Sequence, residues 1–258
     1  KSRAMTAYRC CESKAIVNNP DRTPMNSAPE KFWAVIPAAG VGRRMEAQVP
    51  KQYLQLAGET ILVHTMKRLA SCAGISGLFL GVSPDDAYWP ELAFKAPWLM
   101  SVCDGGRERA ETVSRILDSM ASIVQPHDWV LVHDAVRPCV SHRDIGRLMS
   151  KAAQRDGGLL GRPISDTVKL ADDHGIVQKT VPREGLWRAL TPQMFRYGEL
   201  RNALLDADAK GLQVTDEASA MELAGFQPLM VEGSPDNIKI TVPGDLELAA
   251  VFLQHQEV

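Results

Sequence analysis

The feature that most constrains the fold is an alternation of short apolar runs with longer stretches of helical periodicity. The runs that read as strands are Phe32–Ile36, Leu78–Val82, Leu99–Cys103, Trp129–His133 and Leu159–Gly161. Between them, apolar side chains recur at helical spacing in Ile61–Ala70, Glu108–Ala121 and Arg143–Arg155. Several strands lack polar alternation, so both faces of the sheet should be covered. This order predicts an α/β fold with a mainly parallel sheet, which binds ligands at the carboxyl ends of its strands.

The alternation is interrupted after Pro163. Two β-rich runs, Thr167–Leu170 and Ile176–Val181, flank the turn-forming stretch Asp172–Gly175, which predicts a β-hairpin. We expect this hairpin to project from the domain as an arm at about residues 164–185. The elements expected after it are helices at Glu199–Lys210 and Asp216–Ala224, strands at Pro228–Glu232 and Ile238–Thr241, and a last helix from Pro243.

Residues 1–30 differ from the rest of the chain, because they are polar, contain three prolines and show no sustained periodicity. We expect a disordered leader or a segment derived from expression, followed by one domain at 31–258. The net charge of −2 argues against general nucleic-acid binding, and no apolar run is long enough to span a membrane. The five cysteines show no Cys-x-x-Cys spacing, which favours reduced thiols in a cytoplasmic protein over a zinc site or a disulfide scaffold.

The most informative motif is the loop that follows the first strand, Ile36-Pro-Ala-Ala-Gly-Val-Gly-Arg-Arg-Met45, closed by Pro50-Lys-Gln-Tyr53. Its backbone N–H groups and cationic side chains suit a triphosphate. It is not a P-loop, since Arg43 follows Gly42 where Lys is required, and Met45 is too bulky for a dinucleotide fingerprint. A turn without a ligand is the alternative, but two cations beside it, Arg44 and Lys51, favour an anion site.

With further motifs, this loop resembles the 2-C-methyl-D-erythritol 4-phosphate cytidylyltransferase family. These motifs follow in family order: Asp104–Arg109, His133–Pro138, Asp166–Lys169, Gly185–Gln193, Thr215–Ser219 and Asp236–Lys239. The resemblance covers about residues 32–255 and implies a Rossmann-like nucleotidyltransferase fold of the GT-A type. It also implies an enzyme of the non-mevalonate isoprenoid route that transfers CMP from CTP to a polyol phosphate and releases pyrophosphate.

The resemblance implies a role for each matching residue on the nucleotide side. Arg44 and Lys51 would hold the triphosphate and stabilise charge at the α-phosphate, with Lys239 and Arg183 completing the catalytic set. CTP would be bound by small and polar residues: Pro37, Ala38, Ala39, Gly40, Gly42, Gly106, Arg107, Thr112, Asp134 and Ala135. A carboxylate beside phosphates needs an intervening cation, so Asp134 is expected to hold Mg²⁺, with Asp236 as a second candidate ligand. His133 is expected to be structural.

The polyol phosphate would be bound by residues spread over the second half of the chain. These are Arg137, Thr167, Arg183, Thr191, Thr215 and Lys239. In this family the hairpin interlocks with a second subunit, so the resemblance implies a homodimer whose site is completed across the interface.

Two other functions remain open. Val136, which follows Ala135 in the Asp-Ala-Val-Arg-Pro motif, is shared with ribitol-5-phosphate cytidylyltransferases, which perform the same chemistry on another polyol phosphate. Pro37–Gly40, Thr215–Ser219 and Asp236 favour the methylerythritol enzyme. The second alternative is a nucleotide-binding module without turnover, against which the retained Arg44, Lys51, Asp134 and Lys239 argue.

Overall fold

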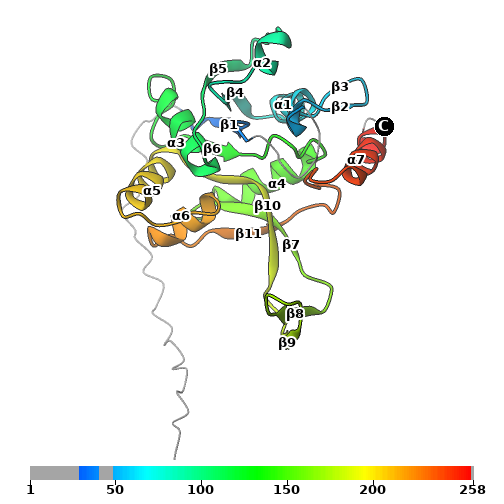
Figure 1. The fold of residues 1–258 in the computed structure, drawn as a ribbon. Coiled ribbons are helices and arrows are strands. Elements are labelled where there is room, and N and C mark those ends of the chain that lie inside the picture. Colours follow the sequence, from blue (N-terminus) through cyan, green and yellow to red (C-terminus); the bar gives the residue numbers. More distant parts are fainter. Residues whose placement is uncertain (1–28, 41–48, 257–258) are drawn as a thin grey trace, which may run out of the picture.

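In the computed structural model, which describes residues 29–40 and 49–256, the domain is built on a seven-stranded sheet (Figure 1). The order across the sheet is β11-β7-β10-β6-β1-β4-β5. These strands span β1 (Phe32–Pro37), β4 (Ile75–Val82), β5 (Leu99–Asp104), β6 (Trp129–Val132), β7 (Gly158–Pro163), β10 (Trp187–Arg196) and β11 (Leu229–Glu232). β10 runs antiparallel to both neighbours, and the other pairs in the sheet are parallel. The predicted α/β fold with a mainly parallel sheet is confirmed.

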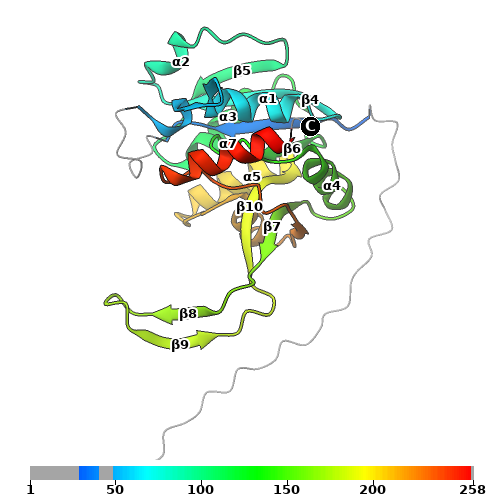
Figure 2. The ribbon, with the colours of Figure 1, turned by 90° about the vertical axis from the view of Figure 1, so that its right-hand side faces the viewer.

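Helices cover both faces of the sheet (Figures 1 and 2). They are α1 (Ile61–Ala70), α2 (Tyr88–Glu91), α3 (Arg109–Ser119), α4 (His142–Ala152), α5 (Tyr197–Ala209), α6 (Glu217–Leu223) and α7 (Gly244–Gln256). A 3-10 turn, η2 (Lys51–Tyr53), and a small ladder of β2 (Gln55–Leu56) with β3 (Glu59–Thr60) precede α1. The start of α4 is capped by Ser141, whose hydroxyl accepts the Asp144 N–H. None of the helices described is long and apolar enough to cross a membrane.

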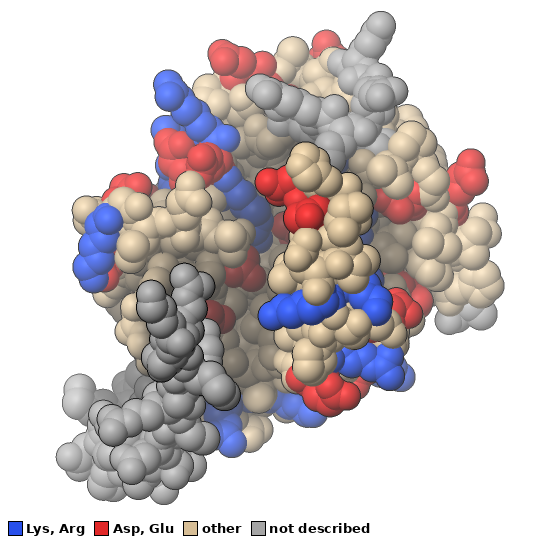
Figure 3. All heavy atoms as spheres, turned by 60° about the horizontal axis from the view of Figure 1, so that its bottom comes forward, with Lys and Arg blue, Asp and Glu red and all other residues tan. Residues whose placement is uncertain are grey.

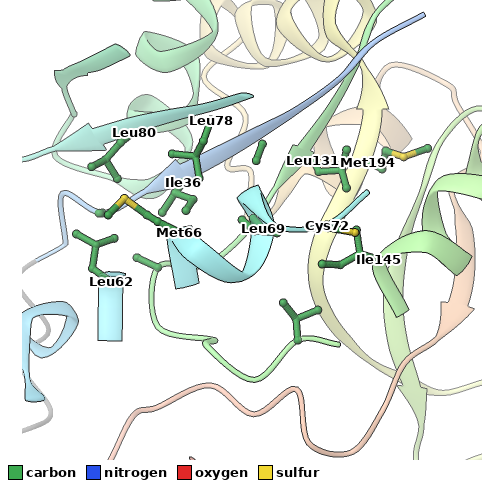
Figure 4. Packing of buried hydrophobic residues seen from close by; sticks show 14 of the residues in the cluster. Ile36, Leu62, Met66, Leu69, Cys72, Leu78, Leu80, Leu131, Ile145 and Met194 are labelled. Carbon is green, nitrogen blue, oxygen red and sulfur yellow. The ribbon is translucent and has the colours of Figure 1, made fainter. Parts of the chain in front are cut away.

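The buried side chains form one apolar layer on each face of the sheet. In the first layer, Leu62, Met66 and Leu69 of α1 and Ile145 of α4 pack onto Ile36 and its neighbours in the sheet (Figure 4). The second layer joins α3, α5 and α6 to the side chains that alternate with these along the same strands, such as Val35. A third, smaller cluster ties α7 to the segment after β6. The sheet is therefore covered on both faces, as its apolar strands predict.

The predicted hairpin is present as β8 (Val168–Ala171) paired antiparallel with β9 (Val177–Val181). Asp172 organises the turn, because its carboxylate accepts the N–H groups of His174 and Ile176. The hairpin stands away from the body of the domain at the end of β7 and β10 (Figure 2). Its exposed surface carries both basic and acidic side chains (Figure 3) and the apolar side chains of Leu170, Ile176 and Val177.

One strand prediction is wrong, and one strand of the sheet was not predicted. Ile238–Thr241 is not a strand but an irregular segment beside the loop that comes after β6. The Ile240 N–H donates to the carbonyl oxygen of Val136 in that loop. β10 was not predicted, since Pro192 lies in its middle and proline usually excludes a central strand. Here the ladder with β7 is irregular between Ala189 and Gln193, so the proline falls where pairing is already broken. The predicted leader at 1–30 falls almost entirely outside the described residues.

Candidate active site

A pocket opens at the carboxyl ends of β1, β5 and β6, where a mainly parallel sheet is expected to bind ligands. It is lined by Pro37, Ala38, Ala39, Gly40, Lys51, Gln52, Gly106, Arg107, Glu108, Arg109, Thr112, Asp134, Ala135, Val136 and Lys239. The three strands run parallel, so loops that are distant in sequence meet at one edge. All the predicted nucleotide-binding residues that the structure describes are in this lining. Gly42 and Arg44 lie outside the described residues.

The first wall of the pocket is held together by Gln52. Its side-chain amide is buried and donates to the carbonyl oxygens of Ala38 (2.9 Å) and Gly40 (3.2 Å). Gln52 belongs to η2 together with Lys51, so these bonds fix the turn that carries Lys51 against the end of β1. The next residue, Tyr53, donates through its hydroxyl to Asp86 (2.7 Å), which anchors the same turn from the other side.

The opposite wall is the loop Gly105–Glu108 between β5 and α3. A Cβ on Gly105 would lie only 2.5 Å from the Cβ of Ala39, so the close approach of the two walls requires glycine at this position. Thr112 is buried, accepts the Gly106 N–H (3.0 Å) and donates to the Glu108 carbonyl oxygen (3.0 Å). The hydroxyl of Thr112 therefore shapes the loop that was expected to bind CTP.

Asp134 is the electrostatic centre of the site. Its Oδ1 accepts from Nε of Arg109 (3.1 Å), and its Oδ2 lies 3.1 Å from Nε of Arg137 and 3.0 Å from Nζ of Lys239. Burial alone would raise the pKa of the Asp134 carboxyl, but the charges of Arg109, Lys239 and Arg137 hold this pKa well below its ordinary value. The carboxylate is thus kept ionised, and it binds three cations, of which Arg109 and Lys239 line the pocket.

His133, next to Asp134, is a fully buried structural residue. Its Nε2 lies 3.0 Å from the carbonyl oxygen of Arg137, which can only accept, so Nε2 carries the proton. Its Nδ1 then accepts the hydroxyl of Thr191 (2.9 Å), and the same hydroxyl oxygen accepts the Asp134 N–H (3.1 Å). Burial lowers the pKa of His133 to about 4. A neutral ring with both nitrogens bonded inside the protein is not placed to act as a base, in agreement with the expectation.

Two of the residues predicted to bind the polyol phosphate lie behind Asp134 rather than in the pocket lining. Arg137 is 8% exposed and is bonded to Asp134 and to the carbonyl oxygen of Asn237 (2.8 Å). Thr191 is 5% exposed and is bonded to His133 and Asp134. In this chain both side chains orient Asp134, and direct contact of either with a substrate remains a prediction.

The other predicted residues lie farther out. Thr167 and Arg183 are exposed at the base of the arm, where the Arg183 guanidinium donates to the Ser165 carbonyl oxygen. Thr215 is exposed just before α6 and lines a separate groove between α3 and α5. Asp236 is half-buried, and Lys239 forms its ion pair with Asp134. A single chain thus gathers Lys51, Lys239 and Asp134 but not the whole predicted set.

Sequence reasoning gave no role to Gln52, Arg109 or Glu217. Arg109 lines the pocket and joins Asp134 to Glu217, which is almost fully buried at the start of α6. The available signal was that Gln52, Arg109 and Glu217 lie inside motifs already singled out, next to residues that did receive roles. The contact between Arg109 and Glu217 spans 108 positions, which no local pattern reveals.

The residues of the pocket could hold a magnesium ion only together with the phosphates of a bound substrate. Within residues 29–40 and 49–256, no three His, Cys, Asp or Glu side chains gather closely enough to hold a metal. Mg²⁺ commonly uses one or two carboxylates together with substrate phosphates and water. A carboxylate offers about four lone-pair sites, and three on Asp134 are taken by cations. Asp134 can therefore supply one further bond, whereas nothing in the described chain links Asp236 to the same position.

Comparison with known proteins is consistent with this geometry. Residues 32–255 match the 2-C-methyl-D-erythritol 4-phosphate cytidylyltransferase family. The protein of that name from Hahella chejuensis is 49% identical over 225 residues, which cover 87% of this chain and 93% of the relative. The Vibrio vulnificus protein of that name is 48% identical over 226 residues, 87% of this chain and 95% of the relative.

A solved structure gives the same result for the fold. The Francisella tularensis 2-C-methyl-D-erythritol 4-phosphate cytidylyltransferase superimposes with a TM-score of 0.75 at 35% identity, covering 86% of this chain and all of that one. A match that extends from the first strand of the sheet to α7 includes every wall of the pocket. The chain therefore belongs to the 2-C-methyl-D-erythritol 4-phosphate cytidylyltransferase family.

Proposed function

We propose that this chain transfers CMP from CTP to 2-C-methyl-D-erythritol 4-phosphate, giving 4-diphosphocytidyl-2-C-methyl-D-erythritol and pyrophosphate. The observation that carries the proposal is the position of Lys51 and Lys239 in the same pocket as the small residues Ala38, Ala39 and Gly106. Small residues let a base and a triphosphate approach the backbone, and lysines neutralise the triphosphate charge.

The reaction requires the protein mainly to position the two substrates and to neutralise their phosphate charges. The attacking group is a phosphate oxygen of the polyol phosphate, which is already largely ionised because its second pKa is about 6. It forms a bond to the α-phosphorus of CTP as the bond from that phosphorus to the pyrophosphate oxygen breaks. Two anions must be brought together, so cations dominate the catalysis. We assign this work to Lys51, Lys239 and Arg44.

Asp134 has an indirect part in this proposal. Its carboxylate holds Lys239 and Arg109 at fixed positions, so these cations need not reorganise when charge develops on the phosphates. Asp134 would also hold Mg²⁺ together with the triphosphate, and the ion would neutralise part of the phosphate charge when bound. We retain Asp236 as a ligand only as a sequence-based prediction.

The proposal includes a homodimer formed through the β8–β9 arm. Three observations support it: the arm exposes Leu170, Ile176 and Val177, it stands away from its own domain, and Arg183 at its base is not among the residues that line the pocket of the same chain. A second subunit could cover the apolar side chains and receive Thr167 and Arg183 beside its own pocket. A cytoplasmic location agrees with the free thiols of Cys72, Cys103 and Cys139.

One assay separates this function from the alternatives. The purified protein is given CTP and Mg²⁺ with either methylerythritol 4-phosphate or ribitol 5-phosphate, and pyrophosphate release is followed. We expect turnover with the first acceptor and at most a few per cent of that rate with the second. A preference for ribitol 5-phosphate would replace the substrate assignment, and CTP binding without pyrophosphate release from either acceptor would indicate a binding module.

A further inference from the structure

Arg109 joins two buried carboxylates that belong to different parts of the fold. Its Nε donates to Oδ1 of Asp134 (3.1 Å), while its two terminal nitrogens donate to Oε1 (2.6 Å) and Oε2 (3.0 Å) of Glu217. Glu217 is only 1% exposed and is not among the residues that line the pocket. The planar guanidinium carries donors on separate edges, so Arg109 binds Glu217 through its terminal edge and Asp134 through its Nε edge, in fixed directions.

Glu217 is held firmly from its own side. It is the first residue of α6, and Asp216 caps this helix by accepting the Ser219 N–H. Gln193 of β10 fixes the same turn, because its amide donates to Asp216 (2.8 Å) and accepts the N–H of Ala218 (2.8 Å). Since β10 pairs with β6 in the sheet, the Glu217 carboxylate is anchored to the same framework as the pocket.

We infer that Glu217 is a positioning residue for the proposed CMP transfer: by binding the terminal edge of the Arg109 guanidinium, it keeps the Nε edge turned toward Asp134. In this orientation Nε of Arg109 donates to Oδ1 of Asp134. The other oxygen of Asp134 stays with Lys239 and Arg137. The inference rests on the proposed function, and Glu217 itself is not in the lining of the pocket.

The charge balance of the site shows what Glu217 prevents. Without the negative charge of Glu217, the terminal edge of Arg109 would be released, and the guanidinium could turn to bind both oxygens of Asp134, which is the preferred geometry of arginine with a carboxylate. Lys239, whose side chain is 40% exposed, would lose its place on Oδ2. The positive charge of Arg109 would nevertheless remain in the pocket, so attraction for the CTP triphosphate would persist. Turnover should therefore fall while CTP affinity does not.

A purely structural ion pair would behave differently. Its removal would lower the stability of the fold, and the folded fraction of the enzyme would keep its kcat. Asp128 offers a matched control, because it is 2% exposed and accepts three hydrogen bonds at the opposite end of β6, from the Lys31 N–H, the Trp33 indole and the Gln125 N–H. Asp128→Asn should reduce stability and leave kcat per folded molecule unchanged.

The test uses the full chain with Glu217→Gln, which preserves size and removes the charge. We expect kcat at saturating CTP and acceptor to fall at least tenfold, and the Kd for CTP, measured by calorimetry, to weaken no more than twofold. A kcat within twofold of the unsubstituted protein would overturn the inference. Equal losses of kcat and CTP affinity would overturn it as well.

Arg109→Lys gives a second variant that keeps the Glu217 charge paired and serves if Glu217→Gln does not fold. An ammonium group lacks the two donor edges that fix Asp134 relative to Glu217, so Asp134 should lose its orientation, and the same fall in kcat without loss of CTP affinity is expected. The double variant should be no more than twofold slower than either single variant, because the two residues act as one unit. Losses that multiply, or an unchanged kcat in Arg109→Lys, would refute the inference.

The assays distinguish a wrong assignment of function from a wrong role for Glu217. If the unsubstituted protein released no pyrophosphate with either acceptor, the function would be wrong. CTP binding would still test the role of Glu217, since a tenfold weaker Kd in Glu217→Gln would mean that Glu217 supports nucleotide binding itself.

Discussion

The buried ring of His133 predicts a specific loss of stability in mild acid. Its pKa is lowered from 6.5 to about 4 in the folded chain, with burial as the main cause. As the pH falls below about 6.5, His133 binds a proton in the unfolded chain but stays neutral in the folded chain. The stabilisation from a neutral His133 is therefore complete above pH 6.5 and is lost progressively down to about pH 4.

The size of the effect follows from the difference of about 2.5 in pKa. At about 1.4 kcal/mol for each unit, the total loss approaches about 3 kcal/mol, of which about 2 kcal/mol falls between pH 7.5 and pH 5. The low pKa of Asp134 does not interfere, because its contribution is present above the unfolded value of about 3.9 and is lost only below it. The window from pH 7.5 to pH 5 thus isolates His133 from Asp134.

Urea unfolding at pH 7.5 and pH 5.0 measures this effect. His133→Gln keeps a donor toward the Arg137 carbonyl oxygen and has no group that titrates, so its unfolding free energy should lose about 2 kcal/mol less over this interval than that of the unsubstituted protein. An equal loss in His133→Gln and the unsubstituted protein would refute the assignment of a buried neutral ring.

Two further predictions concern the walls of the pocket and the arm. Gln52→Leu removes two hydrogen bonds, to Ala38 and Gly40, so the KM for CTP should rise roughly tenfold in steady-state assays; an unchanged KM would show that Gln52 does not shape the nucleotide wall. If the arm completes the site of a second subunit, inactive Arg183→Ala and Lys51→Ala chains should regain activity when mixed, toward about a quarter of the unsubstituted rate from statistical pairing. Absence of rescue in verified mixed dimers would contradict a shared site.

The sequence predicted those parts of the fold that depend on local pattern. The bounds of α1 were predicted without error, and the Asp172–Gly175 turn was predicted from composition alone. The nucleotide pocket was predicted because its residues lie in loops directly after strands. The parallel sheet brings those loops to one edge. Local pattern and topology predicted where such a pocket lies, whereas the family resemblance assigned its residues to CTP.

The remaining features depend on contacts that are distant in the sequence. β10 was missed because Pro192 is compatible with a central strand only through an irregularity of pairing that the sequence does not reveal. Ile238–Thr241 has the composition of a strand, but it bonds to the loop after β6. Arg137 was expected to face a substrate, but in the structure its guanidinium donates to Asp134 and to the carbonyl oxygen of Asn237. Arg109 and Glu217 meet only in the folded chain.

The most direct test of the central claim is a comparison of kcat and CTP affinity in Lys51→Ala. If the pocket stabilises charge at the α-phosphate during transfer, kcat should fall by about a hundredfold or more while the Kd for CTP changes by less than about threefold. Pyrophosphate release under saturating methylerythritol 4-phosphate gives the first quantity, and calorimetry gives the second. Equal losses of kcat and affinity would mean that Lys51 only holds the nucleotide, and the account of the pocket as a site of CMP transfer would be contradicted.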